Sequence, residues 1–141
     1  MEQNKSKEWK KEFSVDNPEL DSHHMKIISL TAELSGAEAT LRPQKYAKIL
    51  SDLTDCFMIH FKCEEAYMAE HSYPFLEQHK DEHHMFIFML SLFNFDYDQE
   101  IPTRANELHQ IITEWLFDHE LRMDSKYRDF IKNKTQPPTV N

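Results

Sequence analysis

Histidine and carboxylate residues recur at helical spacings along this chain, and these are side chains that bind metal ions. The sequence contains nine histidines in 141 residues. His60 and Glu64 are four residues apart, and so are His79 and His83. Side chains four residues apart project from one face of a helix, so each pair can present two ligands to one site. Imidazole suits zinc, copper and iron alike, so the residue types leave the metal open.

Two further groups complete the set. His24 follows Asp21 by three residues, and His119 precedes Asp124 by five. Five residues of an ideal α-helix turn the chain by about 500°, which leaves the two side chains about 140° apart. They can share a site only if the helix bulges or ends there. The sequence therefore predicts a local irregularity near residues 120 to 124.

Helices must position these side chains, and prolines mark where the helices begin. Pro18, Pro43, Pro74 and Pro102 stand at such places, because proline at the first helical position loses no hydrogen bond. Apolar residues then recur every three or four positions. We predict four helices and a short fifth one, over residues 18–37, 43–70, 74–94, 102–121 and 124–132.

Four amphipathic helices with short connections pack best as an all-α, antiparallel up-down-up-down four-helix bundle. The single glycine also argues against a turn-rich β-protein. We expect one domain over residues 1–141, with an N-terminal arm, a bundle that includes the short C-terminal helix, and a tail. These parts would cover residues 1–16, 18–132 and 133–141.

The charge balance and the apolar segments limit the classes of partner that the protein can bind. The formal net charge of −9 disfavours nucleic acid and anionic membrane surfaces. The longest nearly apolar run, Met85 to Phe95, is far too short to span a membrane. We expect it to pack in the core and against a loop, and the alternative is a contact with a separate protein partner or in a homo-oligomer. Residues 1–13 contain no apolar stretch of the kind found in secretory signals, so we expect a soluble protein that is not exported. Cys56 and Cys63 are too far apart on a helix to pair, and reduced thiols suit a cytoplasmic protein.

The histidine and carboxylate spacings resemble the hemerythrin family, whose pattern across a four-helix bundle is H, HxxxE, HxxxH and HxxxxD. The resemblance runs from Trp9 to Tyr127 and includes flanking words such as Tyr73-Pro74. It implies two iron ions joined by an oxo or hydroxo bridge. One iron would be bound by three histidines, the other by two, and two carboxylates would bridge them. These ligands are His79, His83 and His119; His24 and His60; and Glu64 and Asp124.

The resemblance also implies a function, which is reversible dioxygen binding for storage, transport or scavenging by a protein that is not an enzyme. A count of the bonds leaves one octahedral position open, on the iron bound by His24 and His60. Dioxygen binds there in the family. The surrounding pocket would be apolar, although its residues could equally be ordinary core. They are Ile27, Phe61, Trp115 and Leu116, with Glu120 beside them.

Glu120 departs from the family, because the residue after this histidine is commonly a large aliphatic one. It could point into solvent, or it could face the open iron as an extra ligand or proton relay. An inward Glu120 would favour an alternative function, a di-iron redox enzyme that reduces peroxide or handles nitric oxide. A second alternative is an oxygen-sensing module that acts through a separate protein.

Several remaining residues have simpler interpretations. Four histidines match no ligand position and are expected at the surface: His23, His71, His84 and His109. Cys56 and Cys63 are expected to be small buried hydrophobic residues.

Overall fold

The computed structural model describes residues 14–36, 43–93 and 101–135, and these residues are helical almost throughout. Within these ranges the chain forms five α-helices and one π-helical segment, and it contains no strand. The all-α prediction is therefore confirmed. The elements are α2 (Pro18–Gly36), α3 (Pro43–Glu70), α4 (Leu76–Leu92), α5 (Ile101–His119), η1 (Glu120–Asp124) and α6 (Ser125–Thr135).

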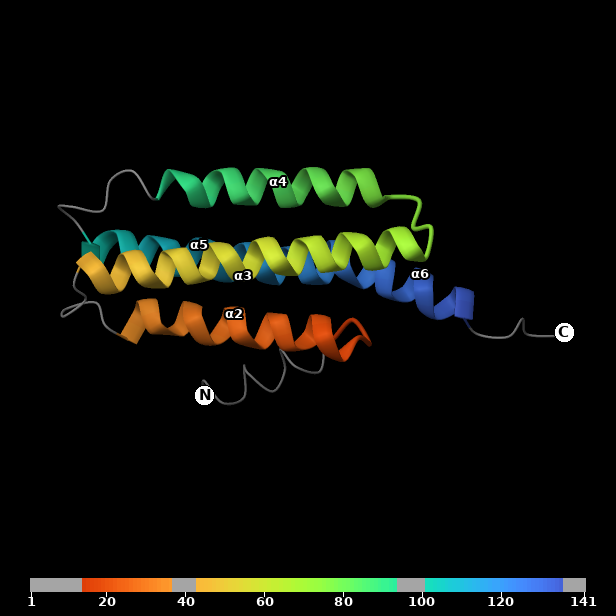
Figure 1. The fold of residues 1–141 in the computed structure, drawn as a ribbon, viewed down its shortest axis with the longest axis horizontal. Helices are drawn as coiled ribbons and strands as arrows, with labels where there is room; N and C mark the ends of the chain where they lie inside the picture. Colours follow the sequence, from red (N-terminus) through yellow and green to blue (C-terminus); the bar gives the residue numbers. More distant parts are fainter. Residues whose placement is uncertain (1–13, 37–42, 94–100, 136–141) are drawn as a thin grey trace, which may run out of the picture.

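Helices α2 to α5 run alternately in opposite directions, which confirms the up-down-up-down arrangement (Figure 1). In this view α2 and α4 lie on opposite sides, with α3 and α5 between them. Helix α2 packs against both α3 and α5, and α4 packs against α3. The segment η1 joins α5 to α6, so these three elements continue one another along the bundle.

The helix boundaries follow the prolines with one shift. Helix α3 ends with Ser72 in the left-handed conformation, at φ 56°, and the Tyr73 N–H donates to the Met68 carbonyl at 3.0 Å. This is a Schellman-type termination, which leaves Pro74 in the turn. Helix α4 consequently begins at Leu76, two residues later than predicted. Helix α6 extends to Thr135, into the segment expected to be tail.

The bundle core consists of two apolar clusters with a polar layer between them. On α2, His24 lies between Leu20 of the smaller cluster and Ile27 of the larger one. On α3, Glu64 lies between Phe61 of the larger cluster and Met68 of the smaller. The predicted ligands thus occupy one level of the bundle. Apolar packing on both sides of this level keeps it away from water.

The exposure of the described residues tests the expectations about the apolar run on α4 and the two cysteines. Met85, Phe88 and Leu92 form an exposed apolar stripe on α4 and are 74%, 68% and 53% exposed. Both cysteines are free and half-buried rather than fully buried. Among the described residues, no helix combines the length and apolar character needed to cross a membrane. Most of the expected N-terminal arm, residues 1–13, lies outside the described ranges.

Candidate metal centre

Eight polar side chains meet in the layer between the two apolar clusters. They come from α2, α3, α4, α5 and η1, and each has at most 2% of its surface exposed. The structure brings together all seven residues expected as ligands, and it adds Glu120 to them. The eight are His24, His60, Glu64, His79, His83, His119, Glu120 and Asp124.

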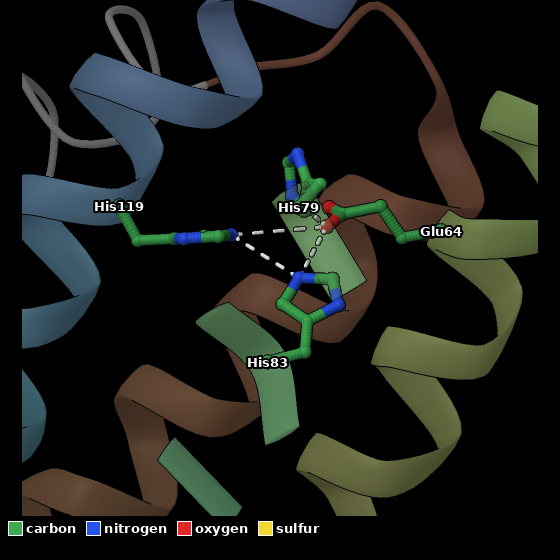
Figure 2. Close-up of side chains that lie close together, drawn as sticks. All are labelled: Glu64, His79, His83 and His119. Atoms are coloured by element: carbon green, nitrogen blue, oxygen red, sulfur yellow. Dashed lines mark hydrogen bonds and ion pairs between the residues drawn. The ribbon is translucent and has the colours of Figure 1, made fainter. Parts of the chain in front are cut away.

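Three of the histidines surround one oxygen of Glu64, and we call them the three-histidine group (Figure 2). The Nε2 atoms of His79 and His83 each lie 3.0 Å from Glu64 Oε1. His119 approaches from α5, with its Nε2 atom 3.2 Å from that of His83 and 3.9 Å from Glu64 Oε1. Three ring nitrogens from α4 and α5 and one carboxylate oxygen from α3 therefore lie close together.

The other two histidines form a second group with two carboxylates, and we call it the two-histidine group. The Nε2 atoms of His24 and His60 are 2.8 Å apart. Glu120 Oε1 lies 2.5 Å from His24 Nε2, and Asp124 Oδ2 lies 3.9 Å from it. In each group the donor atoms all fall within 4.8 Å of one another.

Glu64 and Asp124 each direct one carboxylate oxygen toward the three-histidine group and the other oxygen toward the two-histidine group. While Glu64 Oε1 faces the three-histidine group, Oε2 lies 3.2 Å from His60 Nε2. Asp124 Oδ1 lies 2.9 Å from the Nε2 atoms of both His79 and His119, and Oδ2 is directed toward His24. This is the disposition needed of carboxylates that bridge two cations.

The spacing and protonation of these donors fit bound metal ions. Donors at right angles around a metal with bonds of about 2.1 Å are about 3 Å apart, which matches the separations above. The Nδ1 atoms of His83 and His119 donate to Glu65 and Glu82 at 2.8 and 3.1 Å. In neutral rings, both Nε2 lone pairs then face each other across 3.2 Å, an arrangement that a shared cation stabilises.

Carboxylate oxygens without hydrogen bonds, in the described part of the chain, also indicate bound metal ions. Both oxygens of Asp124 and both of Glu120 are buried without a hydrogen-bond partner of acceptable geometry. Leaving a buried charge uncompensated costs several kcal/mol. A divalent cation in each group would offset that cost. The residues present therefore fit a metal centre.

Segment η1 explains how three nearby residues all point inward. His119, Glu120 and Asp124 are buried, whereas Leu121 between them is 54% exposed. In an α-helix, His119 and Asp124 would face different directions, but the π-helical turn adds a residue per turn and brings them together. The irregularity predicted near residues 120 to 124 is confirmed. Of the two directions considered for Glu120, the structure has the inward one.

Side chains outside the two groups hold the imidazoles in place, and the sequence did not single them out. Glu82 accepts from His119 and also from Arg122, at 2.7 Å, so its charge is shared with an exposed guanidinium. The Tyr127 hydroxyl donates to Glu64 Oε2 at 2.9 Å. The only signals for these residues were proximity to ligands in the chain, such as Tyr127 three positions after Asp124.

His23 corrects an expectation. We expected this ring at the surface, but it is half-buried, and its Nδ1 lies 3.2 Å from Nδ1 of His60. His84 is exposed as expected, while His71 and His109 are half-buried. Neither His84 nor His109 belongs to any group of metal-binding side chains in the described residues, and nor does His71.

Aromatic rings cover the three-histidine group. Phe61 stacks on His83 with ring centroids 3.8 Å apart, and Trp115 stacks on His119 at 4.3 Å. Ile27 and Leu116 are buried in the larger apolar cluster. Two of the residues expected around the ligand pocket thus contact ligand imidazoles directly.

In the metal-free polypeptide, the pKa values of several side chains in this layer are strongly shifted. Burial, with the neighbouring His60, lowers the pKa of His24 to about 3. Burial would also lower the pKa of His79, but the adjacent carboxylates of Asp124 and Glu64 raise it to about 9. Burial and the nearby Asp124 raise the pKa of Glu120 well above its usual range. Without a cation, His79 and Glu120 therefore hold protons more strongly than usual, and His24 holds its proton more weakly.

Comparison with known proteins agrees with a metal centre in this bundle. The Hemerythrin HHE cation binding domain matches residues 16–131. A bacteriohemerythrin of Clostridium acetobutylicum is 32% identical over 130 residues, covering 86% of this chain and 98% of its own. One from Stenotrophomonas maltophilia is 28% identical, over 88% and 80% of the two chains. A hemerythrin-like protein of Naegleria gruberi is 29% identical, over 85% and 89%.

Proposed function

Because the chain belongs to the hemerythrin family, we propose that it holds two iron ions, one in each histidine group, and binds dioxygen reversibly. The observation that carries this proposal is the double contact of Glu64 and Asp124, each with one oxygen in either group. Two bridging carboxylates with five imidazoles favour a pair of irons over a single zinc or copper ion. The relatives named bacteriohemerythrin support the same conclusion.

The iron ligands in this proposal are the seven residues expected from the sequence. Reduced iron would supply the electrons that reversible dioxygen binding requires. Glu65 and Glu82 keep the Nδ1 protons of His83 and His119, so that the Nε2 lone pairs face inward. Tyr127 fixes the orientation of the Glu64 carboxylate. We also infer that residues 18–132 work as one domain, because these helices share the layer.

The surrounding apolar residues would exclude water from the centre. Phe61 and Trp115 cover two of the imidazoles with their ring faces, and both rings also pack against Phe86. Exclusion of water and protons slows the irreversible oxidation of a metal site. This property suits a protein that binds and releases dioxygen unchanged.

The test begins with anaerobic loading of the protein with ferrous iron and a count of iron per chain. We expect two irons per chain, visible charge-transfer bands when dioxygen is admitted, and loss of the bands when it is withdrawn. The His109→Ala variant should behave identically, because His109 lies outside both groups. One iron or none per chain, or bands that never reverse, would overturn the proposal.

One observation favours a second candidate, a di-iron redox enzyme acting on peroxide or nitric oxide. Glu120 lies inside the two-histidine group, where it could carry a proton to or from a bound substrate. The discriminating measurement is turnover. Peroxide or nitric oxide consumption much faster than spontaneous oxidation of the iron would favour the enzyme, and its absence would favour the carrier.

A further inference from the structure

The buried carboxylate of Glu120 is the one side chain of the layer that the proposed dioxygen site does not require. Its side chain is 2% exposed, in the layer between the two apolar clusters. Neither carboxylate oxygen has a hydrogen bond in the described residues. An unpartnered carboxylate at this depth is costly, so it calls for a compensating charge.

The neighbouring imidazole does not by itself provide that compensation. His24 Nε2 is the atom closest to Glu120 Oε1, but the same nitrogen also faces His60 Nε2 at 2.8 Å. A single ring nitrogen cannot donate to both. Other charges that face Glu120 are the carboxylates of Asp124, Glu64 and Asp21, which repel it. A cation between these donors would satisfy all of them together.

We propose that Glu120 is an eighth protein ligand, which binds the metal of the two-histidine group and closes the position where an external ligand would bind. This inference rests on the proposed di-iron centre. Each metal would then have five protein donors. One set is His79, His83, His119, Glu64 and Asp124, and the other is His24, His60, Glu64, Asp124 and Glu120. With one shared bridging atom, two octahedral metals are saturated.

Glu120 therefore acts as a gate for small ligands. A ligand such as azide can enter only when the bond from the Glu120 oxygen to the metal breaks and the azide nitrogen forms a bond in its place. No electron is transferred in this exchange. The apparent affinity falls by the fraction of time that the position is open. The gate is built into η1, whose π-helical turn directs Glu120 inward together with His119 and Asp124.

Azide binding to the oxidised, iron-loaded protein tests this proposal without an activity assay. We compare the unaltered chain with Glu120→Leu, which replaces the carboxylate with an apolar side chain that cannot bind a metal, and with Glu120→Gln, which keeps the size but removes the charge. Glu107→Leu is the matched control, because Glu107 is an exposed glutamate on α5. We expect azide affinity to rise about tenfold or more in Glu120→Leu, to rise less in Glu120→Gln, and to stay unchanged in the control.

The kinetics give a second signature. In the unaltered chain, the observed rate of azide binding should level off at high azide, because release of Glu120 becomes limiting. In Glu120→Leu the rate should rise linearly.

Equal azide affinities in all variants, with linear rates throughout, would overturn the proposal while leaving the di-iron centre intact. Failure of the unaltered chain to load two irons would instead overturn the proposed function. If Glu120→Leu does not fold, the comparison with Glu120→Gln decides the outcome.

Discussion

A histidine binds a metal through a ring nitrogen that carries no proton, so the partner of its other nitrogen decides whether it can act as a ligand. Glu65 and Glu82 take that role for His83 and His119. His23 Nδ1 contacts the outer nitrogen of His60, where either ring can be the donor. The two carboxylates, which can only accept, fix the tautomers of His83 and His119 before any metal arrives, so these imidazoles need little reorganisation to bind one.

Glu82 is therefore expected to affect metal binding without touching the metal. In Glu82→Ala the His119 ring loses the acceptor that holds its outer proton, and we expect iron affinity to fall by about 10- to 100-fold. Competition with a chelator of known affinity measures the change. Glu77→Ala serves as control, because Glu77 is an exposed residue of the same helix. Equal affinities in the two variants would contradict the assigned role of Glu82.

Removal of a carboxylate that has one oxygen near each group should have a larger effect. Glu64→Ala or Asp124→Ala takes one donor oxygen from each group at once, so we expect both irons to be held weakly or lost. Iron content per chain after gel filtration checks this result. His109→Ala should retain its full iron content, and equal losses in all three variants would refute the ligand assignment.

At the scale of the elements, the helices differ in how they are held. Helix α3 packs against α2, α4 and α5, and it carries six buried residues of the larger apolar cluster. Helix α4 instead exposes Met85, Phe88 and Leu92, and it contributes His79 and His83 to the polar layer. A metal bound by these two histidines would tie α4 to α3 and α5. The fixed position of α4 should therefore depend on metal more than that of α3.

Hydrogen exchange can detect this difference. When iron is removed with a chelator, we expect amides of α4 to exchange about tenfold faster or more, because local opening of a weakly packed helix no longer breaks metal bonds. Amides between Tyr46 and Phe57 of α3 should change little, and they serve as the internal reference. A uniform increase across all helices would contradict this picture.

At the scale of the whole molecule, the fold buries a polar layer at the level where all its helices meet. The larger apolar cluster closes this layer on one side, and the smaller one closes it on the other. Such a layer opposes folding unless its charges are balanced. In the metal-free chain, protons supply part of that balance. The histidines with raised pKa hold extra protons against Glu64 and Asp124.

The metal-free protein should consequently lose stability as the pH rises from 6.5 to 9. Burial opposes protonation of His79 and His119, yet their carboxylate partners raise both pKa values, that of His79 to about 9. A raised pKa contributes stability below the unfolded-state value of 6.5, and that contribution is lost as these protons leave. Glu120, whose pKa is also raised, acts in the same direction.

Urea unfolding at pH 6.5 and pH 9 measures the loss as a difference in the free energy of unfolding. The iron-loaded protein should show a smaller difference, because its ligating nitrogens hold metal instead of protons. His79→Gln removes one of the titrating groups, so its metal-free form should also show a smaller difference. Metal-free stability that stays level or rises with pH would contradict the assigned charges.

The amino-acid sequence by itself determined most of the architecture. Prolines and apolar spacing predicted every described helix, because these signals act within a few residues of one another. The start of α4 was displaced by the turn at Ser72, whose left-handed backbone the residue type did not indicate. The five-residue interval from His119 to Asp124 predicted the π-helical irregularity, since only a bulge lets both residues face one site.

Only the tertiary structure decided which side chains meet. The direction of Glu120, the contact of His23 with His60 and the hydrogen bond from Tyr127 to Glu64 depend on how separate helices are rotated against one another. Local spacing cannot specify such rotations, because they arise from packing of the whole apolar core. The sequence therefore predicts which residues are candidate donors, while the inward direction of Glu120 arises from the packed bundle.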